Sequence, residues 1–191
     1  MKFFVIFPLV VVTALLCSAG LGLCLNMTSS LPLGVYRKAG DIERGGFAMF
    51  CLEDKGFIKL AKERGYLGAG RCPGGVKPLG KEVYGLTGDE ISFLGGSGGQ
   101  IVVNGQLIPR SSANSKDSRG RVMPATYLTA GRIPPGFALM LSPHHAGGFD
   151  SRYFGLVKVS ALKPVRPVFI WNHSEKQPFN INIKERRSCR R

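Results

Sequence analysis

An uncharged run of 23 residues, from Phe3 to Leu25, lies at the start of the chain. As a helix it would extend about 34 Å, which exceeds the roughly 30 Å hydrocarbon core of a bilayer. Lys2 precedes the run and favours a cytoplasmic N-terminus. The sequence therefore predicts a membrane anchor over residues 1–25, with the rest of the chain on the other side of the membrane.

A cleaved signal peptide is the alternative interpretation of this run. The apolar region of a signal peptide normally spans about 7–15 residues and is therefore shorter than the run observed. Small residues that suit a cleavage site do occur at Ser18, Ala19 and Gly20. We expect an uncleaved anchor, and cleavage stays open.

The composition restricts the class of protein. The 191 residues include 26 Lys and Arg against 12 Asp and Glu, a formal net charge of +14, which predicts contact with an anionic surface or partner. Glycine accounts for 26 residues without a Gly-X-Y period, which excludes a collagen-like chain and indicates many tight turns. A chain of this length accommodates one folded domain with short appendages.

Short apolar runs separated by turn residues follow the predicted anchor. Strands are expected at 47–51, 82–86, 90–94, 101–103, 137–141, 153–159 and 165–171, and helical periodicity is clear only at 54–66. The pattern predicts one mainly β domain over residues 26–171. It is expected to fold as an antiparallel sheet or partial barrel with one short helical insert. The basic residues 172–191 are expected to form a C-terminal tail.

The segment 26–36 contains candidate hydroxyl groups. If it is extended, residues two apart share a face, so Thr28 would lie beside Ser30. A serine hydroxyl is a weak nucleophile and needs a base. His144 and His145 are adjacent in a glycine-rich loop, and His173 lies in the predicted tail. Neither a histidine-based triad nor a histidine metal site is therefore expected, and the loop is interpreted as solvated.

Lys81 is the other candidate base. In a strand it would share a face with Val83 and Gly85, so apolar neighbours could bury its amine. Burial lowers the pKa of a lysine because the charged form loses hydration, and we expect a value of about 7–9. The alternative is a solvated lysine at a strand edge.

Three motifs resemble those of the bacterial type I signal peptidases, and especially of their TraF-type conjugative-transfer branch. They occur in the family's order, behind an apolar segment, and span most of the predicted domain. The motifs are the alternation Asn26, Thr28, Ser30, Pro32, Gly34, Tyr36, the run Lys81-Glu82-Val83-Tyr84-Gly85-Leu86-Thr87-Gly88-Asp89, and the run Phe149-Asp150-Ser151-Arg152-Tyr153-Phe154-Gly155.

The resemblance implies the roles of five residues. Ser30 corresponds to the nucleophile, and Lys81 to the base that activates it and then protonates the leaving amine. Thr28 corresponds to the hydroxyl that forms the oxyanion hole with the backbone N–H of Ser30. Asp150 and Arg152 correspond to the pair that supports the lysine region.

One departure from the wider family concerns the nucleophile. General signal peptidases have two residues between the serine and the proline, which would select Ser29. The conjugative branch has one, which selects Ser30, and the alternating residues around it fit this register.

The cysteines divide into two groups. Cys51 and Cys72 flank the predicted helix and are expected to form a disulfide in an oxidising periplasm, with two buried thiols as the alternative. Cys17 and Cys24 lie in the predicted anchor as small apolar residues, and Cys189 lies unpaired in the tail.

The resemblance also implies a function. It indicates a serine endopeptidase of the cytoplasmic (inner) membrane, with its catalytic domain in the periplasm, that matures a membrane-embedded pilin precursor for the conjugative transfer machinery, with or without joining the pilin ends. The anionic membrane surface is an expected partner; no cofactor, no metal and no specific nucleic acid binding are expected. Two alternatives stay open: a general type I signal peptidase for exported proteins, and a non-enzymatic basic component of a secretion machine.

Overall fold

The computed structural model describes residues 22–28, 30–143, 145 and 147–171. The predicted tail, most of the predicted anchor, Ser29, His144, Cys17 and Cys189 lie outside the described residues. Within the described ranges, no helix has both the length and the apolar character needed to cross a membrane.

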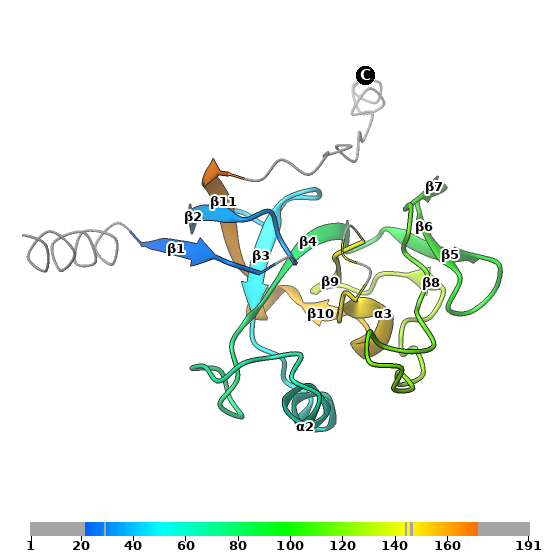
Figure 1. Ribbon diagram of the computed structural model, residues 1–191. Helices are drawn as coiled ribbons and strands as arrows, with labels where there is room; N and C mark the ends of the chain where they lie inside the picture. Colours follow the sequence, from blue (N-terminus) through cyan, green and yellow to red (C-terminus); the bar gives the residue numbers. More distant parts are fainter. Residues whose placement is uncertain (1–21, 29, 144, 146, 172–191) are drawn as a thin grey trace, which may run out of the picture.

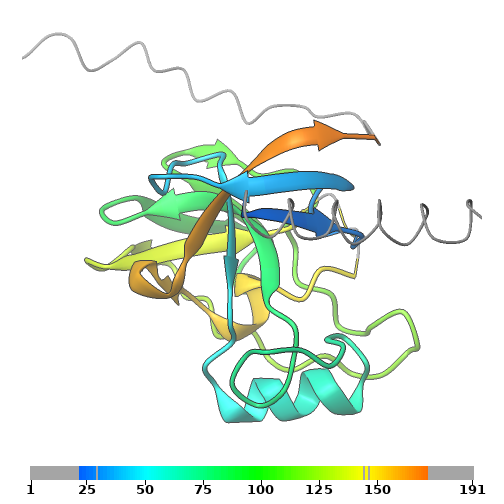
Figure 2. The same ribbon diagram turned by 90° about the vertical axis from the view of Figure 1, so that its left-hand side faces the viewer.

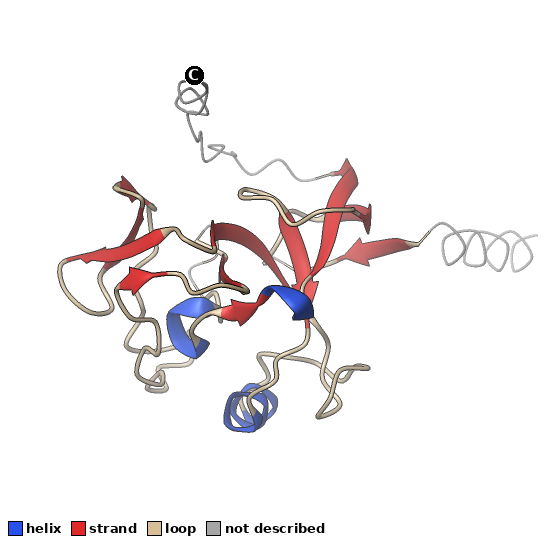
Figure 3. Cartoon of the chain, turned by 180° about the vertical axis from the view of Figure 1, so that it is seen from behind, coloured by secondary structure: helices blue, strands red, loops and turns tan. Residues whose placement is uncertain are grey.

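Strands dominate the described part of the chain, and every pairing between them is antiparallel (Figures 1 and 3). One seven-stranded sheet has the order β1-β2-β11-β3-β4-β9-β10. Its members are β1 (Leu23–Asn26), β2 (Gly34–Lys38), β3 (Phe47–Phe50), β4 (Leu79–Leu86), β9 (Phe137–Leu141), β10 (Val157–Lys158) and β11 (Lys163–Ile170). The predicted mainly β, antiparallel fold is confirmed.

A second sheet lies on the side of the molecule away from β1 (Figure 1). Its order is β7-β6-β5-β8. The strands are β5 (Glu90–Leu94), β6 (Gln100–Val103), β7 (Gln106–Leu107) and β8 (Gly131–Arg132). Asn104 and Gly105 both have positive φ angles, 51° and 78°, between β6 and β7, as a type I′ hairpin turn requires.

The helix α2 (Lys55–Glu63) lies below the strands in Figure 2, inside the range where the sequence predicts a helix. The carboxylate of Asp54 accepts a hydrogen bond from the backbone N–H of Phe57 and so caps the first turn. A disulfide joins Cys51 to Cys72, with 5.5 Å between their Cα atoms, and closes the segment that contains α2. This is the pairing that the sequence predicts.

The predicted strand at 153–159 is wrong. The structure has the short helix α3 (Ser151–Phe154), the two-residue β10 and the 3-10 turn η1 (Val159–Ala161). The Asp150 carboxylate accepts from the backbone N–H of Arg152 and caps α3, and Gly155, with φ 79°, ends it. A capped, four-residue helix is too short to show helical periodicity in a sequence.

The segment 26–36 is not extended throughout, so the condition for placing Thr28 beside Ser30 on one face is not met. Strand β1 ends at Asn26, and the chain turns before β2 begins at Gly34. The amide of Asn26 holds this turn because its Nδ2 donates to the carbonyls of Leu31 (3.0 Å) and Pro32 (3.1 Å). Ser30 therefore lies in the β1–β2 turn, and β1 itself starts at Leu23, inside the segment predicted as the anchor.

Apolar side chains on both faces of β4 and β9 hold the two sheets and α2 together. On one face, Val83 and Met140 pack in a cluster with Ile58 of α2. On the other, Tyr84 and Leu139 belong to a cluster that includes the second sheet. The central strand β4 is thus buried along most of its length, which decides the environment of any polar residue on it.

Candidate active site

Lys81 lies on the central strand β4, opposite Ala48 of β3. It is 1% exposed, so the solvated alternative is wrong. Burial lowers the pKa of Lys81 to about 8; the charge of Asp150 opposes this shift, and that of Arg152 adds to it. The predicted range of 7–9 is confirmed, and the amine is poised to exist in both protonation states near neutral pH.

Asp150 and Arg152 form a buried, bidentate ion pair at the start of α3. Arg152 donates from Nε to Oδ1 and from Nη2 to Oδ2, both at 2.8 Å. The guanidinium also donates to the carbonyls of Gly148 (3.1 Å) and Ser112 (3.0 Å). Burial disfavours the charge of Arg152, but the hydrogen bond and charge of Asp150 outweigh it and raise the pKa of Arg152. These four hydrogen bonds therefore hold both side chains in one buried position.

Ser142 joins this ion pair to the β1–β2 turn. It directly follows β9 and is fully buried. Its backbone N–H donates to Oδ2 of Asp150 (3.0 Å), and its Oγ donates to the carbonyl of Ser30 (3.0 Å). The sequence analysis did not identify Ser142; the only signal is a polar residue at the end of an apolar strand.

The residue after Ser30 also connects the turn to β4. The side chain of Leu31 is buried against Gly80, and a Cβ at Gly80 would lie 2.8 Å from Leu31 Cδ1. Gly80 immediately precedes Lys81 in β4. Ser30, Lys81 and the Asp150–Arg152 pair therefore belong to one site, although they come from three distant parts of the chain.

Thr28 has a different environment from the one expected. It is exposed, and its hydroxyl donates to Oδ1 of Asn26 at 2.7 Å. Because 26–36 is not a single strand, the rule that residues two apart share a face does not apply to Thr28 and Ser30. Its role in an oxyanion hole stays a prediction.

His145 is less solvated than the sequence suggests. His145 is half-buried, and its backbone N–H donates to the carbonyl of Ser142 at 3.1 Å. The carbonyl of His145 accepts from the backbone N–H of Gly148 at 2.9 Å. These turn contacts lead the chain from β9 to Asp150.

Comparison with known proteins assigns the family. The model of the family "Signal peptidase, peptidase S26" matches residues 1–171. The chain belongs to the S26 signal peptidase family. It is therefore a peptidase of the signal peptidase type, and the motif at 149–155 lies within the matched range.

Relatives of this S26 peptidase include proteins named for plasmid transfer. A plasmid transfer protein TraF of Escherichia coli is 36% identical over 165 residues, covering 84% of this chain and 91% of the relative. The conjugal transfer protein TraF of Agrobacterium fabrum is 35% identical over 155 residues, covering 79% and 84%. The crystal structure of a signal peptidase I from Enterococcus faecalis aligns with a TM-score of 0.36 and 18% identity, covering 66% of this chain and 97% of that chain.

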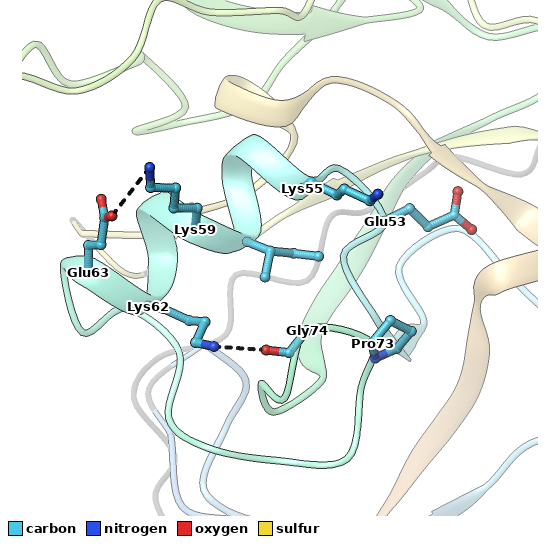
Figure 4. Close-up of a pocket in the computed structure, with 8 residues that line it drawn as sticks. Glu53, Lys55, Lys59, Lys62, Glu63, Pro73 and Gly74 are labelled. Carbon is cyan, nitrogen blue, oxygen red and sulfur yellow. Dashed lines mark hydrogen bonds and ion pairs between the residues drawn. The ribbon is translucent and has the colours of Figure 1, made fainter.

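The S26 peptidase also has a hollow of about 510 Å³ beside α2 (Figure 4). Lys62 Nζ donates to the carbonyl of Gly74 (3.1 Å) at its rim, and Lys59 pairs with Glu63 at 3.9 Å. Ser30, Lys81 and the Asp150–Arg152 pair do not line this hollow, so it is separate from the candidate active site. Its lining residues are Glu53, Lys55, Ile58, Lys59, Lys62, Glu63, Pro73 and Gly74.

Proposed function

We propose that this S26 peptidase is a serine endopeptidase in which Ser30 is the nucleophile and Lys81 the general base. The buried amine of Lys81 carries the proposal. With a pKa of about 8, about one molecule in ten has a neutral Lys81 at pH 7, against about one in 2,500 for an ordinary lysine. A neutral amine is the state that accepts a proton from a serine hydroxyl.

The proposed chemistry is acyl transfer in two stages. Neutral Lys81 takes the proton of the Ser30 hydroxyl while Oγ attacks the scissile carbonyl carbon. The resulting oxyanion accepts from the backbone N–H of Ser30 and from Thr28, whose hydroxyl must first leave Asn26. Lys81 then protonates the departing amine as the C–N bond breaks, and water attacks the acyl-serine with Lys81 again as base.

The proposed site of action is the periplasmic surface of the inner membrane. Leu25, Met27, Phe169 and Trp171 form an exposed apolar patch, with exposed fractions between 45% and 68%. Leu25 of β1 and Phe169 of β11 both lie opposite Val35 of β2, and the ring of Trp171 lies 6.1 Å from that of Phe169. An exposed apolar patch next to a predicted anchor suits a membrane interface, where Trp is enriched.

The proposed substrate is a membrane-embedded pilin precursor of a conjugative system. Two observations support it: the named relatives are transfer proteins, and the exposed patch favours a substrate presented at a bilayer. The disulfide is typical of an oxidising compartment such as the periplasm.

The test is to co-express the full chain with the pilin gene of the same genetic element and to weigh the pilin by mass spectrometry. Processing is expected with the wild type and with Ser29→Ala, and is expected to be lost in Ser30→Ala and in Lys81→Ala. A product one water lighter than the cut chain would show that the ends are joined. Processing that survives Ser30→Ala would overturn the proposed nucleophile.

The two alternative functions predict different results. A general signal peptidase would also cut the precursors of unrelated exported proteins in the same cells. A non-enzymatic component would support plasmid transfer equally well as the wild type and as Ser30→Ala. Selective processing of the pilin, with transfer lost in Ser30→Ala, is the result that we expect.

A further inference from the structure

The carbonyl of Ser30 accepts a hydrogen bond from a residue in a distant part of the chain. Its partner is the hydroxyl of Ser142, 112 residues away in sequence and 3.0 Å away in space. Asn26 holds the later residues of the turn through the carbonyls of Leu31 and Pro32. The Ser142 contact ties Ser30 itself to the residue that follows β9.

Ser142 is itself rigidly placed. It is fully buried, its N–H donates to Asp150, and its carbonyl accepts from the N–H of His145. Asp150 is in turn fixed by two hydrogen bonds from Arg152, and both members of this pair are almost completely buried. Because the Ser142 backbone is held by these hydrogen bonds, its hydroxyl is fixed in place and can in turn fix the carbonyl of Ser30.

The same ion pair also acts on Lys81. The charges of Asp150 and Arg152 influence the amine in opposite directions. The Asp150 carboxylate therefore acts on both members of the proposed dyad: on Lys81 through its charge, and on Ser30 through the hydrogen bonds of Ser142.

From this chain of contacts we infer that Ser142 is a positioning residue, whose hydroxyl fixes the backbone of Ser30 relative to Asp150 and so sets the approach of the nucleophile to Lys81. The inference rests on the proposed function. Nucleophile and base must meet within hydrogen-bonding distance, and an error of about 1 Å can reduce a rate by about 100-fold. Removing the Ser142 hydroxyl should therefore lower kcat and leave substrate binding and the titration of Lys81 intact.

The variant Ser142→Ala of the full chain, purified in mild detergent, tests the inference with a pilin-derived peptide as substrate. We expect kcat to fall by about 10- to 100-fold, KM to change by less than about threefold, and the midpoint of the pH profile to stay in place. Ser111→Ala is the matched control. Ser111 is also a buried serine whose hydroxyl bonds two backbone groups, but these are the N–H of Ile101 and the carbonyl of Ile108, in the region of the second sheet. Its kcat should equal that of the wild type.

A second variant guards against misfolding. Ser142→Cys keeps an unbranched side chain with one terminal donor and replaces the hydroxyl by a slightly larger, weaker donor, so kcat should lie between those of the wild type and Ser142→Ala. Thermal melting of all variants accompanies the kinetics, with equal losses of Tm expected for Ser142→Ala and Ser111→Ala.

The outcomes separate this inference from the proposed function. Activity that is present in the wild type and lost in Ser30→Ala establishes the peptidase first. A kcat for Ser142→Ala equal to that of the Ser111→Ala control, or a displaced pH midpoint, then overturns the positioning role alone. An inactive wild type, or an active Ser30→Ala, overturns the proposed function and the role of Ser142 with it.

Discussion

The pH dependence of the reaction follows from the environment of Lys81. The pKa of its amine is lowered to about 8, and in the proposed mechanism the neutral form is the active one. The value of kcat/KM should therefore be low at pH 6, rise through about pH 8 and then level off. Lys81→Arg should be inactive throughout, because a guanidinium stays protonated. Initial rates on a pilin-derived peptide between pH 6 and 10 measure the profile; a flat profile would exclude Lys81 as the base.

The buried amine also opposes folding. Because the pKa of Lys81 is lower in the folded than in the unfolded chain, the unfolded chain binds more protons between about pH 8 and pH 10.4, and stability rises with pH across this window. Below it, the full penalty of about 3 kcal/mol applies. Lys81→Met should therefore be inactive and, at pH 7, more stable to urea by about 1–3 kcal/mol. The gain should disappear near pH 10.5, and a gain independent of pH would contradict this explanation.

Gly148 has no room for a side chain. A Cβ there would lie 2.7 Å from Nη2 of Arg152 and 3.1 Å from Oδ2 of Asp150. Gly148→Ala should displace the ion pair, reduce the free energy of unfolding by about 1–3 kcal/mol and lower activity. Gly40→Ala is the control, because a Cβ at Gly40 meets nothing within 4 Å. Urea unfolding of both variants decides the matter, and equal stabilities would refute the steric argument.

At the scale of elements, the segment closed by the disulfide supports the catalytic motif. The ring of Phe57 in α2 lies 6.0 Å from that of Phe149, and the ring of Tyr66 lies 5.4 Å from it. Phe149 immediately precedes Asp150. The α2 segment thus packs on the residue that leads into the buried ion pair.

Loss of the Cys51–Cys72 bond should release this segment. The bond closes a loop across a sequence separation of 21, and opening such a loop costs about 3 kcal/mol through the greater entropy of the unfolded chain. The double variant Cys51→Ser, Cys72→Ser should be less stable to urea by that amount. Reductant should weaken the wild type to the same level and leave the double variant unchanged; a reductant-sensitive double variant would point to another cause.

Elements were predictable from the sequence where local signals and tertiary packing agree. The helix near 54–66 has a cap and a clear apolar face, and Lys81 lies among alternating buried residues of β4. The short helix α3 and the turn that contains Ser30 were not predicted, because each depends on hydrogen bonds of a single side chain. The Asp150 carboxylate caps α3, and the Asn26 amide holds the turn. Such caps become visible only when the folded backbone brings donor and acceptor together.

At the scale of the whole molecule, the site joins parts that no local pattern connects. Ser142 was not predictable, since its partners Ser30 and Asp150 lie 112 residues before it and 8 residues after it. Ser30, Lys81, Asp150 and Arg152 could be identified from the resemblance to a family, because they lie in three motifs that occur in the family's order along the sequence. A sequence motif does not show which backbone groups of distant segments form hydrogen bonds in the folded chain, such as that of the Ser30 carbonyl with Ser142.

The exposed apolar patch should matter only when the substrate is embedded in a membrane. Exchanging Phe169 and Trp171 for serine should slow processing of the membrane-embedded precursor several-fold, because partition of aromatic side chains into the interface is lost. Hydrolysis of a short soluble peptide should be unchanged. Leu107→Ser, an exposed position on the second sheet, is the control. Equal losses on both substrates would mean that the patch serves the fold and not the membrane.

Strand β11 pairs with both β2 and β3, so the seven-stranded sheet depends on one of the last segments of the described chain to be synthesised. During synthesis Ser30 emerges well before Ser142 and before the last strand, Lys163–Ile170. Until those residues arrive, β2 and β3 have no partner between them, the Ser30 carbonyl has no donor from β9, and Lys81 has no buried ion pair beside it. The contacts that bring the Ser30 turn and Lys81 together are therefore expected to form only after the residues up to the end of β11 have been synthesised.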